Sequence, residues 1–163
     1  MEKIVESFEL YGKQYRFETG ELAKQATGAV LVTQGDTTIL VTAVVSKQEK
    51  DYDFFPLTVD YIEKMYSVGR IPGGYLKREA RPSEKGTLNA RMIDRPIRPG
   101  FPDGYKNEVH IVATTLVCDG ENQPDVICVG GTAGRGCPLR RPCRLCQNRP
   151  QRGNGRVHRQ PHL

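Results

Sequence analysis

The chain has 163 residues, of which 37% are hydrophobic and 26% are charged. This length allows one domain of ordinary size, and the composition is typical of a globular protein rather than of a fibre. No apolar run approaches the roughly 20 residues that a transmembrane helix requires, and residues 1–6 lack the basic and apolar regions of a secretory signal. We therefore expect a cytoplasmic protein that is not inserted in a membrane.

The formal net charge of +5 is the sum of two unlike segments. Residues 132–163 contain eight arginines and no acidic residue, whereas residues 1–131 contain 16 basic and 19 acidic residues. All the aromatic residues also lie in the first segment. This division predicts a folded domain over residues 1–131, followed over residues 132–163 by a basic tail rich in Arg, Pro and Cys.

The first half of the folded segment predicts two hairpins. Residues 8–11 and 15–18 are strand-like and are joined by a short connection that contains Gly12. Residues 29–33 and 38–45 form a similar pair around Gln34-Gly35-Asp36. The last of these strands is apolar nearly throughout, which is typical of a strand covered on both faces, although the pattern alone also fits a buried helix.

Further strands are predicted at residues 54–61 and 109–117, with a loop and a helix between them. Glycine and proline residues across residues 69–82 indicate irregular backbone. Ser83 is a suitable N-cap for the helix that follows, and the helix dipole favours Glu84 in its first turn.

An apolar stripe of Leu88, Met92 and Ile93 marks the side of this helix that should be buried. Pro96 should end the helix at or before Arg95. A second helix should begin near residues 122–125, and its pattern becomes illegible at Gly130-Gly131. Together the elements predict an α+β fold, mainly of antiparallel strands, with one or two packed helices.

Residues 69–98 carry a net charge of +5 in a segment that is otherwise acidic. Within it, Arg91, Arg95 and Arg98 are spaced four and three residues apart, which places them on one face of a helix. Guanidinium groups on one face repel each other unless an anion lies between them, and they bind phosphate in a bidentate manner. The spacing therefore predicts a phosphate or RNA-backbone site. The alternative is that the arginines pair with Asp94 and other acids on a solvated surface.

A second group of cations lies in the loop before the helix. Tyr75 precedes Lys77 and Arg78 by two and three residues, and this combination of a stacking surface with cations is typical of proteins that bind single strands. Nearby glycines permit close approach of a ligand to the backbone. The candidate RNA- or phosphate-binding residues are thus Tyr75, Lys77, Arg78, Arg81, Arg91, Arg95 and Arg98.

These motifs closely resemble the first core domain of bacterial polynucleotide phosphorylases. The resemblance covers residues 1 to about 131 and is most specific between Phe54 and Pro102. It is carried by Phe54–Tyr61, Gly69–Gly74, Arg81–Glu84 and Arg91–Pro99, and also by Gly35–Thr37 and Asn122–Asp125. A stand-alone ribonuclease PH fits less well, because the block from Phe54 to Gly74 looks specific to the first domain of polynucleotide phosphorylase.

The resemblance implies a fold and an activity. The fold is ribonuclease PH-like, a mixed sheet with packed helices, incomplete here at its C-terminal end. Members of the family degrade RNA from its 3′ end with inorganic phosphate, release nucleoside diphosphates, assemble as homotrimers and use Mg²⁺. By this resemblance, Tyr75–Arg78 would line the narrow entrance that holds single-stranded RNA. The usual pattern there is two aromatic residues before two arginines, and Leu76 and Lys77 replace one of each. Arg91, Arg95 and Arg98 would lie towards the active site.

The same resemblance places the catalytic and metal-binding residues mainly in a second core domain, so we assign no catalytic residue and no metal ligand to this chain. The expected role is RNA binding and scaffolding of a phosphorolytic active site, with the chain inactive alone.

The tail allows three interpretations. Cys143-x2-Cys146-x11-His158-x3-His162 is one residue short of a two-Cys, two-His zinc finger, which would make the chain a non-enzymatic nucleic-acid-binding module. The residues between Cys146 and His158 lack the aromatic and leucine residues of a finger core, so a disordered basic tail is the plainer alternative.

The third interpretation is a change of reading frame. With CGN codons for arginine, the frame that begins at the second base of the Cys137 codon permits Val-Pro-Phe-Asp-Gly-Pro-Val-Gly-Phe-Val-Lys-Ile-Gly. This string resembles what the family carries after the position of Gly131. We therefore expect that residues 132–163 result from a frame-shifting deletion near residues 130–132 and are disordered.

Overall fold

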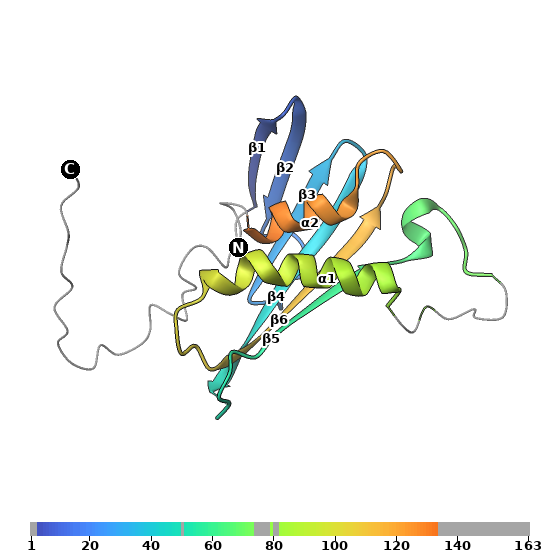
Figure 1. Ribbon diagram of the computed structural model, residues 1–163. Coiled ribbons are helices and arrows are strands. Elements are labelled where there is room, and N and C mark those ends of the chain that lie inside the picture. Colours follow the sequence, from blue (N-terminus) through green and yellow to red (C-terminus); the bar gives the residue numbers. More distant parts are fainter. Residues whose placement is uncertain (1–2, 50, 74–78, 80–81, 134–163) are drawn as a thin grey trace.

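The computed structural model describes residues 3–49, 51–73, 79 and 82–133 (Figure 1). These residues form two layers, a six-stranded sheet and two α-helices that lie on the same face of it (Figure 1). The elements in chain order are β1 (Ile4–Leu10), β2 (Lys13–Thr19), β3 (Gly28–Gln34), β4 (Thr37–Glu49), β5 (Leu57–Glu63), η1 (Met65–Val68), α1 (Glu84–Ile97), η2 (Arg98–Gly100), β6 (Asn107–Val117) and α2 (Pro124–Ala133).

The sheet is mixed, with the strand order β1-β2-β3-β4-β6-β5. Every neighbouring pair is antiparallel except β5 and β6, which are parallel and are connected through α1. A parallel pair requires such a crossover, and a helix is its usual form. The predicted α+β fold of mainly antiparallel strands is therefore confirmed, with one parallel pair at its edge.

Both predicted hairpins are present, with tighter turns than expected. The β1–β2 turn consists of Tyr11 and Gly12, which have φ values of 51° and 71°. Two residues with positive φ match the right-handed twist of the strands, so β2 already begins at Lys13. In the β3–β4 turn, Gly35 has a φ of 58°, and a Cβ atom there would lie 2.7 Å from Nδ2 of Asn122. This position therefore requires glycine for its conformation and for the space.

The hydrophobic core lies between the sheet and the helices. On β4, Val41, Ala43 and Val45 are buried and lie beside Ala113, Ile111 and Val109 of β6 in the antiparallel register. Each fully buried valine or isoleucine stabilises the fold by about 1.5–3 kcal/mol relative to an exposed one. The expectation that β4 is covered on both faces is wrong. The helices cover one face only, and Val44 on the other face is 50% exposed.

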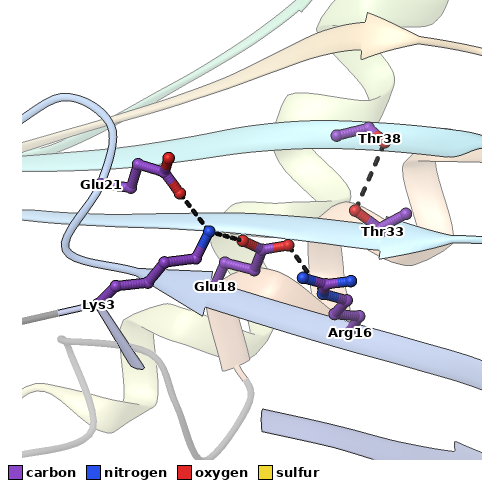
Figure 2. Close-up of polar contacts among 6 residues, drawn as sticks. All are labelled: Lys3, Arg16, Glu18, Glu21, Thr33 and Thr38. Atoms are coloured by element: carbon purple, nitrogen blue, oxygen red, sulfur yellow. Dashed lines mark hydrogen bonds and ion pairs between the residues drawn. The ribbon is translucent and has the colours of Figure 1, made fainter. Parts of the chain in front are cut away.

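The face of the sheet opposite the helices carries polar contacts on β2, the strand next to the β1 edge (Figure 2). Nζ of Lys3 lies 2.9 Å from Oε2 of Glu18 and also binds Glu21, and Nε of Arg16 lies 2.8 Å from the other oxygen of Glu18. The hydrogen bond from Lys3 lowers the pKa of Glu18. These contacts tie the segment before β1 and the segment after β2 to the polar face of the hairpin.

Helix α1 begins as predicted, because Oγ of Ser83 accepts a hydrogen bond of 3.0 Å from the backbone N–H of Gly86. The expected apolar stripe is correct only for Ile93, which is fully buried. Leu88 is 61% and Met92 is 57% exposed, and the buried face instead consists of Gly86, Asn89, Ile93 and Ile97.

The predicted end of α1 at or before Arg95 is also wrong, since the helix contains Pro96 and continues to Ile97. Pro96 cannot donate to the carbonyl of Met92 and its ring crowds that carbonyl, so the helix tolerates the proline at the loss of one hydrogen bond close to its end. The N–H of Arg98 still donates to the carbonyl of Asp94, and the chain then passes into η2.

Helix α2 begins at Pro124, as expected, and continues to Ala133, past the glycines where the sequence pattern becomes illegible. It buries Ile127 and Cys128 against the sheet, where desolvation raises the pKa of the Cys128 thiol. A thiol in such surroundings stays protonated and is a poor nucleophile. Neither α1 nor α2 is long and apolar enough to cross a membrane, and this holds for every helix in the described part of the chain.

Candidate nucleic-acid interface

Two of the predicted site residues, Arg91 and Arg95, lie on the exposed face of α1, and Arg98 follows as its C-cap. Gly86, Asn89, Ile93 and Ile97 fix the rotation of the helix by packing on the sheet side. Arg91, Arg95 and Arg98 consequently lie on the opposite side, and all three are exposed. The prediction that their spacing brings them to one face is therefore confirmed by the geometry.

The three arginines differ in their contacts. Nε and Nη2 of Arg98 donate to the two carboxylate oxygens of Asp94 over 3.1 and 2.9 Å. Nη1 of Arg98 donates to the carbonyl oxygen of Phe55 over 3.3 Å, and Cζ lies 5.6 Å from the centre of the Phe55 ring. The sequence-based alternative of pairing with Asp94 thus holds for Arg98, whose guanidinium is fixed at the end of α1.

Arg91 and Arg95 are different, because neither forms an ion pair or a hydrogen bond with the part of the chain that the structure describes. Two guanidinium groups one helical turn apart repel each other by a few tenths of a kcal/mol. The described residues offer them no carboxylate that would offset this repulsion. As far as the described residues are concerned, both guanidinium groups are therefore available to an anion.

The remaining predicted site residues, Tyr75, Lys77, Arg78 and Arg81, lie outside the described residues. The structure does describe how the loop that carries them is anchored at Glu79. A carboxylate oxygen of Glu79 accepts a hydrogen bond of 2.7 Å from the backbone N–H of Met65, and Nζ of Lys64 donates to the Glu79 carbonyl over 3.0 Å. This anchor ties the loop to the start of η1. Sequence reasoning missed it, because Glu79 lies in a run of cations whose charge dominates the pattern.

A second polar cluster, which sequence reasoning did not identify as a cluster, joins the β3–β4 turn to the loop before α2. Oδ1 of Asp119 accepts hydrogen bonds from the backbone N–H groups of Glu121 and Asn122 over 2.9 and 2.8 Å, and from Oγ1 of Thr37 over 2.9 Å. Nδ2 of Asn122 donates to Oδ2 over 2.7 Å. The resemblance motifs at Gly35–Thr37 and Asn122–Asp125 meet here, and their role in this structure is to fix the start of α2.

The magnesium ion implied by the family has no fitting site in the described part of the chain. Among those residues, no group of three or more His, Cys, Asp or Glu side chains is arranged to hold a metal ion. His110 and Asp60 form an isolated pair, with Nε2 of His110 2.8 Å from Oδ2 of Asp60 on the exposed face of the sheet.

Comparison with known proteins agrees with this fold and with the sequence motifs. Residues 12–134 match the model of the 3′ exoribonuclease family, domain 1. The chain is 54% identical over 130 residues to the polyribonucleotide nucleotidyltransferase of Desulforamulus reducens, an alignment that covers 80% of this chain and 18% of that enzyme. It is 57% identical over 128 residues to the enzyme of the same name from Natranaerobius thermophilus, with 78% and 18% covered. The chain thus spans less than a fifth of the length of these relatives.

A solved structure of the Archaeoglobus fulgidus exosome with RNA bound to the active site has a similar fold. It superposes with a TM-score of 0.50 at 20% identity over 71% of this chain and 46% of that chain. The ribonuclease PH-like fold and the predicted resemblance to a bacterial polyribonucleotide nucleotidyltransferase are both confirmed. Since the family model matches well over half of its residues, the chain belongs to the 3′ exoribonuclease family, of which it carries domain 1.

Proposed function

We propose that this chain is the RNA-binding first core domain of a 3′-to-5′ phosphorolytic exoribonuclease, which releases nucleoside diphosphates and acts in RNA degradation. Its relatives are polyribonucleotide nucleotidyltransferases, and the family model covers most of the chain. The observation that carries RNA binding is the pair of exposed arginines, Arg91 and Arg95, without a carboxylate partner among the described residues. The chain itself is inactive alone, because it supplies RNA contacts and a scaffold, whereas the reacting groups belong to a further domain.

The proposal includes the partners of the complete enzyme. Single-stranded RNA and inorganic phosphate are its substrates, the complete protein is a homotrimer, and a divalent cation such as Mg²⁺ binds outside the described part of this chain. Tyr75, Lys77, Arg78 and Arg81 in the loop before α1 complete the RNA-binding surface. Lys77 in place of an arginine lowers the contribution of bidentate phosphate contacts at that position.

The arginine pair is tested through the salt dependence of RNA binding. We expect Arg91→Ala/Arg95→Ala in the full chain to weaken binding of an oligoadenylate. The slope of log K against log salt should fall by about 0.7 for each phosphate that is no longer neutralised, because each neutralised phosphate releases condensed counterions from the strand. Fluorescence anisotropy of a labelled oligomer at several salt concentrations measures both quantities.

The matched control is Lys24→Ala/Lys47→Ala, which removes the same charge from the loop after β2 and from the end of β4. Both residues are exposed and distant in sequence from α1. The basic tail is present in every variant, so its contribution to the slope cancels in the comparison. Equal salt slopes for the α1 double variant and the unmodified chain would show that Arg91 and Arg95 do not contact the phosphates of the RNA. The same assay on Lys77→Ala/Arg78→Ala tests the loop.

A further inference from the structure

An aromatic cleft lies beyond the C-terminal end of α1. It is lined by Tyr52–Phe55 from the segment before β5, and by Arg98 and Phe101–Lys106 from the segment that links α1 to β6. Its volume is about 280 Å³. Tyr52 and Phe54 form one stacked pair, with ring centres 5.4 Å apart and ring planes inclined by 21°. The side chain of Phe54 is 68% exposed, which is unusual for so large an apolar residue.

The walls of this aromatic cleft are held in place by contacts within the fold. Phe55 packs against Phe101 and Tyr105 with ring centres 4.6 and 5.6 Å away, and all three border the hydrophobic core. Nζ of Lys106 lies 3.1 Å from Oδ1 of Asp51 and links the two walls. The N–H of Tyr105 donates to the carbonyl of Pro102 over 3.2 Å and closes the turn between them. The cleft is therefore formed before any ligand binds.

The charge of the aromatic cleft distinguishes it from the arginine face. Its lining contains two cations, Arg98 and Lys106, and two acids, Asp53 and Asp103, so the lining has no net formal charge. Both cations are already paired, Arg98 with Asp94 and Lys106 with Asp51. A phosphate group gains little in such surroundings, whereas the flat face of a nucleobase stacks on an aromatic ring whatever the base. Arg98 belongs to both places, since it follows Arg91 and Arg95 on α1 and its guanidinium lies over Phe55.

We propose that the aromatic cleft binds one unstacked nucleobase of single-stranded RNA, while the flanking phosphates lie on Arg91 and Arg95. This inference rests on the proposed function and adds to it a base-binding site outside the arginine face. Phe54 supplies the exposed stacking surface. The rigid wall behind it consists of Phe55, Phe101 and Tyr105. Arg98 lies between the arginines that bind phosphate and the cleft that binds the base.

The first test compares an oligoadenylate with an abasic oligomer that has the same ribose-phosphate backbone. We expect Phe54→Ala in the full chain to weaken oligoadenylate binding by roughly five- to a hundredfold, the range expected when one stacking interaction is removed. Its affinity for the abasic oligomer and its salt slope should not change, because the substitution removes no cation. Phe54 is largely exposed, so its truncation leaves the core intact, which circular dichroism checks.

The second test uses the absence of tryptophan from the sequence. Phe54→Trp places the only tryptophan of the chain in the aromatic cleft, where its emission can be excited apart from that of the tyrosines, and we expect oligoadenylate but not the abasic oligomer to quench it. Tyr11→Trp is the matched control, since Tyr11 is 97% exposed in the β1–β2 turn, away from the cleft. Its fluorescence should not respond to either oligomer.

The outcomes separate this inference from the proposed function. Unchanged oligoadenylate affinity in Phe54→Ala, together with a lower salt slope in the α1 double variant, would overturn the base site and leave the RNA-binding function standing. Unchanged binding in both variants would overturn both. Equal quenching of the tryptophan fluorescence in the Phe54→Trp and Tyr11→Trp variants would also overturn the base site.

Discussion

Asp119 accepts hydrogen bonds from four donors in two stretches of the chain, and this explains why one exposed carboxylate matters for the fold. The backbone and side chain of Asn122, the hydroxyl of Thr37 and the backbone of Glu121 all donate to it. Hydrogen bonds to the ionised form, those from Asn122 first, hold the pKa of Asp119 well below its usual range. The β3–β4 turn and the start of α2 are therefore stabilised by a charge.

We expect Asp119→Asn to lower the melting temperature of the full chain at about pH 7. The folded-state pKa of Asp119 is lowered, so its stabilising contribution is fully present above the ordinary value of 3.8 and decreases as the pH falls below it. The difference in melting temperature between the two proteins should therefore narrow as the pH is lowered to about 3. Thermal unfolding monitored by circular dichroism at each pH measures this difference.

Asp36→Asn is the control for this experiment. Asp36 lies in the same turn and is exposed, and its side chain forms no hydrogen bond with the described residues, yet its replacement removes the same charge. It should change the melting temperature little at either pH. A difference for Asp119→Asn that stays constant across the pH range would contradict the role of the ionised carboxylate.

At the scale of the element, α1 shows that a helix is positioned by its neighbours as well as by its own pattern. Leu88 and Met92 are its most hydrophobic residues besides the isoleucines, yet they lie on the exposed side. Gly86 and Asn89 are buried instead, and a Cβ atom at Gly86 would lie 3.3 Å from Oγ of Ser83. The same Cβ atom would lie 3.5 Å from the carbonyl oxygen of Tyr61 in β5, so Gly86 faces the sheet and the arginines face away from it.

We expect Ile93→Ala to destabilise the chain by about 2–5 kcal/mol, because it leaves a cavity in the core. Leu88→Ala on the exposed side should cost less than about 0.5 kcal/mol. Chemical denaturation of the two variants gives both free energies of unfolding. Similar losses of stability in the two variants would mean that α1 packs with a rotation different from the one described.

At the scale of the whole molecule, the two segments of the chain have different origins in our interpretation. We infer that residues 1–131 are an incomplete ribonuclease PH-like domain and that residues 132–163 result from a change of reading frame. The match to the family model ends at residue 134, and the relatives match over about 130 residues, which supports this division. Within the tail, Thr132 and Ala133 form the end of α2, and residues 134–163 lie outside the described residues.

Sequencing of fresh genomic DNA from codon 125 onwards tests this inference. The expected result is a restored frame that continues from the first segment into a second core domain. An intact frame that ends at Leu163 would contradict it, and zinc analysis of the purified chain then becomes decisive. Stoichiometric zinc that disappears in Cys143→Ser would favour the alternative of a nucleic-acid-binding finger.

The sequence by itself determined the number and order of most elements, because these follow from local signals. Runs of apolar and β-branched residues marked β3, β4 and β6, glycines marked the hairpin turns, and Ser83 marked the start of α1. The family assignment also followed from the sequence, since its motifs are contiguous runs. The spacing of Arg91, Arg95 and Arg98 was sufficient to place them on one face.

Only the tertiary structure decided which side of each element is buried and which charges are already paired. β4 has apolar residues on both faces, so only the position of the helices shows that one face is open. Asp94 lies within four residues of all three arginines in the sequence, but in the structure its carboxylate forms an ion pair with Arg98. The aromatic cleft joins segments about 50 residues apart, and such contacts depend on packing that no local pattern encodes.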